Sequence, residues 1–500
     1  MPNPVSKSAF GFSLGAKPSI QAGPVLALLA IVLITGLLFP GDAMFMSDEA
    51  QLLEHALIAN HQPLNVLGIP LPFTPARAGL QGLRGYEGPF AVWVYQIFLL
   101  MTHNPIVMVA VRAVLVSGST ALGLAWLARS MRLSPWYAPL SMLSPWLWVY
   151  NRALWDNSFG IPLAAIAVAA YADFLITRRR WTLLLAAVSL AAMSLVHLMS
   201  APLIAALGLH ALLFERRSVA RFRWGLLLIG ILWFCAFSRY FQTPPIGNSV
   251  ENLPNVTTEP GWWNPLLGGH HLTAAFDWLP STYGHLPLIL VVCQAITLLP
   301  HPVVWMGMGL AALRVRRPWR SLTPVDHLVL LALAVAALQS VLDGMVRVGP
   351  EPLYFNATWI VFVILAWYAV DALCRWAWKP AITVLLPVAA YVAAMTVVLG
   401  YSILLIHHNG GTRSIDYGTV LEDQMRAARR IQQFSPKSPI DITYLQWRTT
   451  TWAKDALVAL LPPPPGPRPL RRLLVRYRNA YPEEARIEVE DFPIWADRPQ

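Results

Sequence analysis

Residues 44–57, MFMSDEAQLLEHAL, follow the first long apolar segment and place Ser47, Asp48 and Glu49 at the start of a predicted helix. This order is typical of a helix N-terminus, because a serine caps free backbone N–H groups and acids oppose the helix dipole. The same helix carries an apolar stripe suited to lying on a membrane surface, made of Leu52, Leu53, Ala56 and Leu57. The pattern fits a capped surface helix and a reactive acidic site equally well.

The rest of the chain indicates an integral membrane protein. Of its 500 residues, 56% are hydrophobic and 13% are charged, whereas soluble domains carry about a quarter charged residues. Mean hydropathy is +0.50. Apolar runs long enough to cross a bilayer occur about eleven times by the hydropathy criterion. They cover residues 24–40, 106–128, 133–150, 159–176, 181–196, 199–214, 224–240, 286–313, 327–342, 353–373 and 381–406.

The run 89–101 is too short to span a membrane and is more typical of an interfacial helix. With that interpretation, four arginine-rich loops fall on one side of the membrane: 129–132, 178–180, 216–223 and 314–320. The positive-inside rule makes that side cytoplasmic. We therefore expect a cytoplasmic N-terminus in a bacterial inner membrane. The net charge of +11 then reflects loop topology and indicates no nucleic-acid partner.

The composition divides the chain into two domains. Residues 1–406 form the predicted membrane domain, with a long first extracytoplasmic loop at 41–105. Charged residues return after residue 406, and 407–500 are predicted to form a soluble extracytoplasmic domain with a helix at 417–434 and short strands at 440–445, 470–477 and 486–489. The expected fold class is an all-α polytopic membrane protein with interfacial helices in its first loop and a small C-terminal α/β domain.

Three acidic residues fall at one predicted depth on the outer face. Asp48 starts the first loop, Glu87 lies in GLRGYEGP at 82–89, and Asp156 lies in NRALWDNS at 151–158. Acidic residues at the hydrocarbon boundary are costly unless they are solvated, paired or functional. Together they could activate a nucleophile or hold a divalent cation, with Asp48 and Asp156 as the candidate metal ligands.

Cationic residues occur at the same predicted depth. Arg84 precedes Glu87, Arg347 ends the ninth apolar run and His197 ends the fifth. Each one alone is explained by a side chain reaching from a helix end toward water, or by a hydrogen-bonded terminal histidine. As a group they suit a phosphate at the interface, because arginine binds phosphate through paired donors.

These motifs resemble the GT-C superfamily of membrane glycosyltransferases, in particular the branch with protein O-mannosyltransferases and the lipid A aminoarabinose transferase. The resemblance rests on the acidic pair after the first helix, the aromatic-Glu-x-Pro element at 86–89 and Asp156 at the outer end of the third span. It covers residues 24–354. It implies transfer of a sugar from a polyprenyl-phosphate carrier to a lipid, glycan or protein acceptor on the extracytoplasmic face. Membrane lipids are a further expected partner of the protein.

The resemblance also implies roles for individual residues. Asp48 matches the first-loop acid, the candidate general base of a single inverting displacement, while Glu87 and Asp156 match the two other acids. The aminoarabinose branch has a lysine after the second glutamate, where this chain has Gly88, so Arg84 or Arg347 would have to supply that phosphate contact. The expected substrate-binding residues are Glu49, Arg84, Tyr86, His197, Arg347 and Tyr354.

Two other functions remain open at this stage. A transporter or flippase of lipid-linked sugars predicts ionisable residues deep within spans and broken helices near the membrane midplane. A glycan polymerase or ligase would depend on arginines more than on an acidic base. The sequence indicates no certain cofactor beyond the candidate divalent metal ion.

Overall fold

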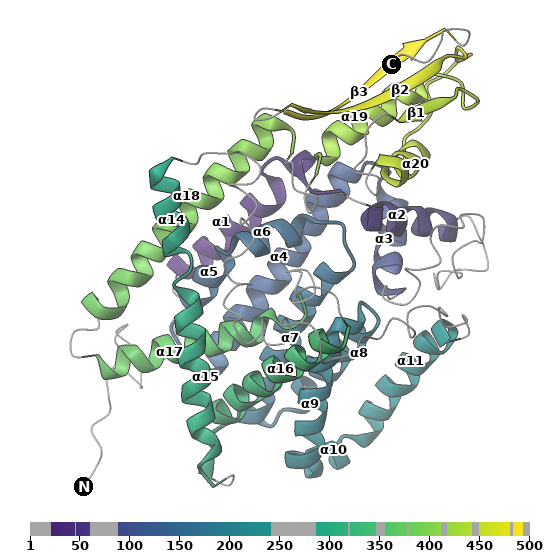
Figure 1. The fold of residues 1–500 in the computed structure, drawn as a ribbon. Coiled ribbons are helices and arrows are strands. Elements are labelled where there is room, and N and C mark those ends of the chain that lie inside the picture. The colour runs from purple at the N-terminus through teal and green to yellow at the C-terminus, as the bar shows by residue number, and fades with distance from the viewer. Residues whose placement is uncertain are drawn as a thin grey trace.

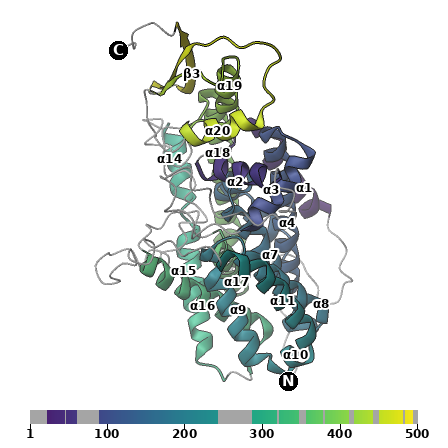
Figure 2. The ribbon, with the colours of Figure 1, turned by 90° about the vertical axis from the view of Figure 1, so that its right-hand side faces the viewer.

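The computed structural model describes residues 22–45, 47–60, 89–241, 287–318, 321–346, 356–377, 381–411, 418–442, 450–480 and 484–493. These residues form a helical bundle that carries a small α/β layer at one end (Figure 1). Figure 2 places α19, α20 and β3 at that end and α8 and α10 near the opposite one.

The centre of the bundle is built from closely approaching helices. They are α1 (Ala22–Leu37), α4 (Pro105–Ser130), α7 (Gly160–Thr177) and α8 (Arg180–Ser194). Small residues allow the approach, as is usual between membrane helices. At the contact of α4 with α7, a Cβ added to Gly123 would lie 2.8 Å from the Cβ of Ala165. A larger side chain at either position would push the two helices apart.

The remaining helices pack around this centre. They are α9 (Ala201–Phe214), α10 (Arg216–Arg221), α11 (Arg223–Phe241), α14 (Leu288–Ile296), α15 (Pro300–Val315), α16 (Pro324–Val346), α17 (Trp359–Trp376) and α18 (Leu386–Asn409), the last preceded by a π-helical turn at Ala381–Leu385. Gly307 lets α15 cross α17 closely, because a Cβ there would lie 2.2 Å from the Leu365 carbonyl oxygen.

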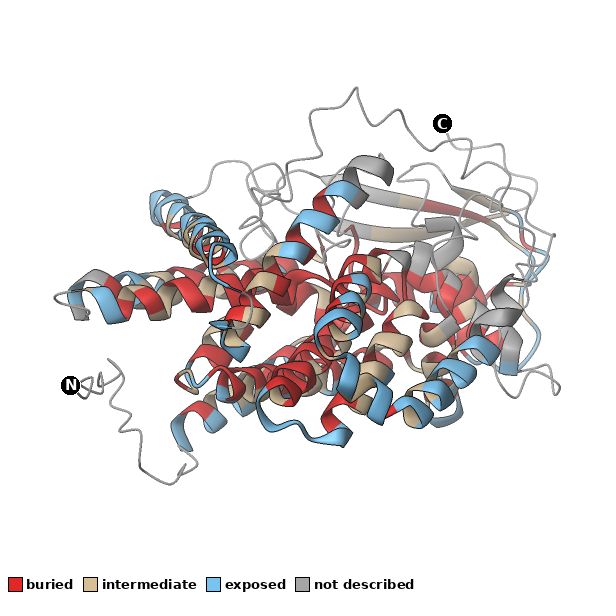
Figure 3. Cartoon of the chain, turned by 90° about the horizontal axis from the view of Figure 1, so that it is seen from below, coloured by how far each residue is buried: buried red, intermediate tan, exposed pale blue. Residues whose placement is uncertain are grey.

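The helices have the lengths and surfaces of a polytopic membrane protein. In the described chain, six helical segments are long and apolar enough to cross a bilayer, with α14 and α15 counted as one, and five further apolar helices are shorter. The helices bury their inward faces and expose apolar side chains on their outward faces (Figure 3). Leu100 is 79% exposed and Leu122 is 73% exposed. Such side chains on a helical surface are suited to contact lipid, and the predicted fold class is confirmed.

The predicted span at 133–150 is not a single helix. It forms α5 (Tyr137–Met142) and α6 (Pro145–Arg152), each too short to cross a bilayer. The break falls before Pro145, which has no backbone N–H and disfavours a helical conformation at the residue before it. Ser144 accordingly has an extended backbone, with φ −60° and ψ 124°.

The first loop contributes η1 (Pro40–Asp42), α2 (Ser47–Asn60) and α3 (Pro89–Met101). The prediction that the apolar stripe of α2 lies on the membrane is wrong, because Leu52, Leu53 and Ala56 are fully buried in the protein. They share a core with α3 and with Leu457 and Leu460 of α20. A stripe of this kind requires an apolar partner, and here the partner is another part of the chain.

The C-terminal region consists of α19 (Leu421–Gln432), β1 (Ile440–Ile442), α20 (Thr450–Leu460), β2 (Arg472–Ala480) and β3 (Glu484–Phe492). The sheet order is β1-β2-β3, with β1 parallel to β2 and β2 antiparallel to β3. Ile440 lies opposite Leu473, and Val475 opposite Val489. Ile431 and Phe434 from the end of α19 pack on this sheet.

Candidate functional site

The site is organised by Arg112, a fully buried arginine about two turns into α4. A buried guanidinium is stable only when its donors and charge are satisfied. Its Nη1 donates to the Asn151 carbonyl oxygen at 3.1 Å, and its Nη2 donates to the Trp155 carbonyl oxygen at 3.1 Å and to the Ser158 hydroxyl. Arg112 therefore holds the non-helical turn between α6 and α7, which carries Asp156.

Acidic and aromatic side chains from other elements face the same guanidinium. Glu49 of α2, Tyr95 of α3 and Asp156 all interact electrostatically with Arg112, and all are buried. The Phe159 ring lies below the guanidinium, with its centroid 4.4 Å from Cζ. We call Glu49, Tyr95, Arg112 and Asp156 the acid–arginine cluster. It joins α2, α3, α4 and the turn before α7 at one point.

Asp156 has a structural role in addition to its charge. Its Oδ1 accepts a hydrogen bond of 2.6 Å from the backbone N–H of Asn157, which caps the 3₁₀ turn η2 (Asn157–Phe159). One carboxylate oxygen is thereby fixed in orientation. Glu49 of the first loop shares the cluster with Asp156, and the roles predicted for these two acids stay predictions.

The other predicted acids cannot be placed with the same detail. Asp48 belongs to the first turn of α2, next to Glu49, but its side chain lies outside the described residues. Glu87, Arg84, Tyr86, Gly88, Arg347 and Tyr354 also lie outside the described residues. Their roles stay predictions, as does the divalent metal site of Asp48 with Asp156. Within the described part of the chain, no group of three or more His, Cys, Asp or Glu side chains is arranged to hold a metal.

His197 lies in the turn between α8 and the 3₁₀ helix η3 (Leu198–Ser200). Its Nδ1 accepts a hydrogen bond of 3.1 Å from the Met199 backbone N–H, and burial lowers the pKa of His197 to about 4. His197 is therefore neutral near pH 7 and would meet a phosphate as a neutral donor, not as the cation that the sequence suggested. Its turn contacts α3, since the Leu195 carbonyl oxygen accepts from the Phe90 N–H at 3.1 Å.

Arg112 and Tyr95 were not among the predicted site residues. The signal for Arg112 was present in the sequence, because an arginine within an apolar run of membrane-spanning length is costly and usually buried against partners. Its partners were not visible, since they are mostly backbone carbonyls of a distant turn. Tyr95 carried no signal, because an aromatic residue in an apolar helix is ordinary.

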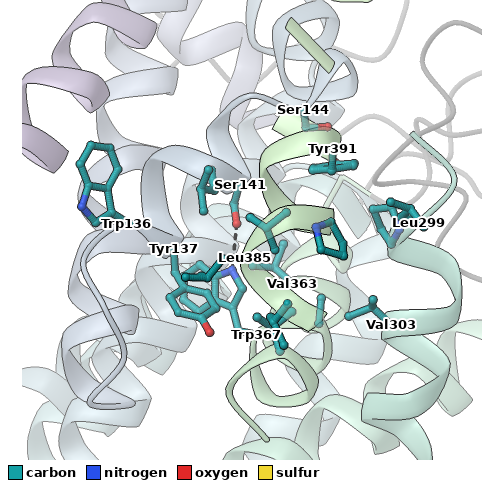
Figure 4. Close-up of a pocket in the computed structure, with 17 residues that line it drawn as sticks. Trp136, Tyr137, Ser141, Ser144, Leu299, Val303, Val363, Trp367, Leu385 and Tyr391 are labelled. Carbon is teal, nitrogen blue, oxygen red and sulfur yellow. Dashed lines mark hydrogen bonds between the residues drawn. The ribbon is translucent and has the colours of Figure 1, made fainter. Parts of the chain in front are cut away.

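An apolar cavity of about 210 Å³ lies between α5, α15, α17 and α18 (Figure 4). Its lining is aliphatic and aromatic, and the Trp367 indole Nε1 donates to the Ser141 hydroxyl at 2.9 Å across one wall. Trp136 at one edge packs against Gly23 at the start of α1, whereas Glu49 follows the other end of that helix. The cavity suits a hydrocarbon chain and is separate from the acid–arginine cluster.

No protein-family model matches the chain, and no curated protein matches it in sequence. Solved structures do match. ArnT from Cupriavidus metallidurans bound to undecaprenyl phosphate is 14% identical, with a TM-score of 0.52, over 95% of this chain and 98% of that one. Apo ArnT from the same organism is 15% identical, with a TM-score of 0.49, over 92% and 93% of the two chains. The chain thus has the fold of ArnT, a fold that agrees with the polytopic helical architecture expected from the sequence.

Proposed function

We propose that the protein transfers a sugar from a polyprenyl-phosphate carrier to an acceptor at the end of the membrane domain that carries the C-terminal region. The acid–arginine cluster supports this proposal most directly. It brings the first turn of α2, with Asp48 and Glu49, to the turn that carries Asp156. It does so in a chain with the fold of ArnT, a protein whose solved structure contains undecaprenyl phosphate.

The proposed chemistry is one inverting displacement. The acceptor hydroxyl oxygen attacks the anomeric carbon, its proton passes to Asp48, and the bond from that carbon to the phosphate oxygen breaks with its electron pair on the carrier phosphate. A general base typically contributes 10² to 10⁴ in rate. The departing phosphate requires preorganised cationic donors more than it requires an acid. Arg84 and Arg347 are the proposed donors, with Tyr86, Glu87 and Tyr354 as further substrate contacts.

Arg112 has a different role in this proposal. Its Nη1 and Nη2 donors are used by the Asn151 and Trp155 carbonyls and by Ser158. We assign it the role of holding the turn that carries Asp156 and of balancing the charges of Glu49 and Asp156. The two acids in turn orient the acceptor beside Asp48.

The charge distribution supports an extracytoplasmic site. Arg129, Arg178 and Arg216 lie at or beyond the ends of α4, α7 and α9, while the acid–arginine cluster joins α2 and α3 near the C-terminal region. Figure 2 shows α10 and the C-terminal helices at opposite ends of the molecule. By the positive-inside rule the arginine-rich end is cytoplasmic, and the proposed location is a bacterial inner membrane.

The test uses purified protein with a radiolabelled polyprenyl-phosphate sugar and measures the release of free carrier phosphate. Asp48→Asn should lower turnover by roughly 10² to 10⁴, the usual contribution of a general base, without unfolding the protein. Asp173→Asn is the matched control, because Asp173 is not part of the acid–arginine cluster. It lies on α7, where its carboxylate accepts a hydrogen bond from the Thr177 hydroxyl. Unchanged turnover in Asp48→Asn would remove Asp48 as the base.

One observation favours the transporter alternative. Arg112 is an ionisable residue buried within a spanning helix, and the run 133–150 is divided between α5 and α6, as that alternative predicts. Proteoliposomes separate the two functions. Movement of the lipid-linked sugar across the bilayer with its phosphodiester bond intact would support a flippase, and release of carrier phosphate supports transfer.

A further inference from the structure

The segment between α1 and α2, residues 38–45, leads directly into the acid-bearing first turn of α2. From the membrane domain it is held by Arg152, whose Nη1 donates to the Leu38 carbonyl oxygen at 2.8 Å and whose Nη2 donates to that of Phe39. Phe39 has a left-handed backbone with φ 48°, which is unfavourable for a residue with a side chain. The Arg152 contacts offset that cost and fix where the segment turns.

The C-terminal region holds the same segment from the other side through Gln424 of α19. Its Nε2 donates to the Phe45 carbonyl oxygen at 2.7 Å and to the Thr419 carbonyl oxygen at 2.8 Å. Beside it, the Leu421 N–H donates to the Ala43 carbonyl oxygen at 3.0 Å. Gln424 and Phe45 are buried, so these hydrogen bonds do not compete with water.

A third link joins α18 to η1. Nδ1 of His407 lies 2.9 Å from Oδ2 of Asp42, and the His407 ring stacks on Phe39 with centroids 3.7 Å apart. Burial raises the pKa of Asp42, while His407 and Arg152 act in the opposite direction. Gly41 lies against α19 at this junction, because a Cβ there would lie 2.7 Å from Oε2 of Glu422 and the Glu422 side chain would have to move.

Helix α2 is thus held at two levels by the C-terminal region. Gln424 fixes the carbonyl two residues before α2 begins at Ser47. Further along, Leu52, Leu53 and Ala56 pack in one core with Leu457 and Leu460 of α20. Between these two levels lie Asp48 and Glu49.

We infer that Gln424 is a positioning residue for the proposed transfer reaction, through which the C-terminal region sets the register of the first turn of α2. The hydrogen bonds of the Gln424 amide go to the backbone carbonyl oxygens of Phe45 and Thr419. Its amide fixes the Phe45 carbonyl, and the helix that starts two residues later presents Asp48 and Glu49. The inference rests on the proposed function and gives the C-terminal region a role in catalysis.

The chain offers a matched control on the same helix. Gln432 is buried like Gln424, and its Nε2 also donates to two carbonyl oxygens, those of Val458 and Leu461, both at 2.8 Å. Those acceptors belong to the C-terminal region itself. Gln424→Ala and Gln432→Ala therefore remove equivalent hydrogen bonds, but only the first removes a bond to the loop of the membrane domain.

The first measurement is steady-state transfer of the sugar by full-length protein in nanodiscs. Gln424→Ala should lower kcat by roughly 10- to 100-fold with little change in the KM for the donor, since a displacement of about 1 Å has effects of that size. Gln424→Met keeps a side chain of similar length but has no donor, so it should behave the same way and serves as the second variant if Gln424→Ala does not fold. Gln432→Ala should lower kcat less than Gln424→Ala does, because its acceptors lie on and just after α20, which reaches α2 through side-chain packing and not through the segment that leads into its first turn.

The second measurement does not depend on the activity. Hydrogen–deuterium exchange should increase in peptides covering 43–52 for Gln424→Ala, and only in peptides covering 450–461 for Gln432→Ala. Equal kcat values and equal exchange at 43–52 in both variants would overturn the inference. Increased exchange at 43–52 in a protein that transfers no sugar would instead refute the proposed function while leaving the positioning contact established.

Discussion

The two ends of the bundle bury polar side chains in different ways. At the arginine-rich end, the Tyr171 hydroxyl lies 2.7 Å from Nδ1 of His210, and Nε2 of His210 lies 3.0 Å from Nδ1 of His327. These side chains come from α7, α9 and α16 and bond one another. At the other end, Arg112 binds mainly backbone carbonyls of a turn and faces carboxylates.

The polar side chains at the arginine-rich end join helices, whereas the acid–arginine cluster at the other end orients the groups of the candidate site. Tyr171, His210 and His327 hydrogen bond one another, and these bonds stabilise the packing of α7, α9 and α16. The acid–arginine cluster fixes a turn through main-chain acceptors and gathers Glu49 and Asp156 around one guanidinium. We therefore expect substitutions at the first end to change stability alone and substitutions at the second to change activity as well.

The largest effect is expected for Arg112→Leu. Removal of one partner of a buried ion pair leaves uncompensated charge and costs about 3 to 5 kcal/mol. The variant should unfold at lower denaturant concentration and should transfer no measurable sugar. Arg112→Lys should not restore transfer, because an ammonium cannot reproduce the planar guanidinium contacts. Full activity of Arg112→Leu would show that the cluster is only structural.

Low pH should destabilise the end of the bundle that contains the acid–arginine cluster, because His197 becomes protonated there. Its pKa is lowered from 6.5 to about 4 in the folded state, so its contribution to stability is present above pH 6.5 and is lost as the pH falls toward 4. The integrated effect is about 3 kcal/mol, at about 1.4 kcal/mol per pKa unit. His197→Asn keeps an acceptor for the Met199 N–H and does not titrate. A Tm that falls equally with pH in both proteins would contradict this assignment.

The opposite end is tested with His210→Phe. The variant loses hydrogen bonds to Tyr171 and His327 and should be less stable by about 1 to 3 kcal/mol. Its kcat should stay at the wild-type value once the protein is folded, because His210 lies in the last turns of α9, at the end of that helix away from His197. A selective loss of kcat at full Tm would make this end part of the reaction.

The smallest change in stability is expected at Asp156, where two substitutions separate charge from capping. Glu49 still faces the guanidinium in both variants, so the charge of Arg112 stays balanced. Asn caps helices about as well as Asp, so Asp156→Asn should change stability little, whereas Asp156→Ala also loses the cap and should cost about 1 kcal/mol. Both should lower transfer, because both remove the carboxylate that Arg112 faces. Wild-type kcat in Asp156→Asn would limit Asp156 to its capping role.

Local chemistry determined much of the architecture. The run 89–101 was predicted as a short interfacial helix, and α3 spans Pro89–Met101. Ser47 was predicted to begin the next helix, and α2 begins there. Hydropathy, proline and capping act over a few neighbouring residues, so the sequence shows them directly. The predicted strands at 440–445, 470–477 and 486–489 likewise overlap β1, β2 and β3.

Only the tertiary structure decided how these elements meet. The stripe of α2 fitted a membrane surface and α20 equally well, and folding placed it on α20. Arg112 donates hydrogen bonds to carbonyl oxygens about forty residues away, and Gln424 donates to the carbonyl oxygen of Phe45. Every residue has a backbone carbonyl, so the sequence does not show which ones will serve as acceptors. The physical reason is that any buried donor needs an acceptor, but which acceptor it meets depends on long-range packing.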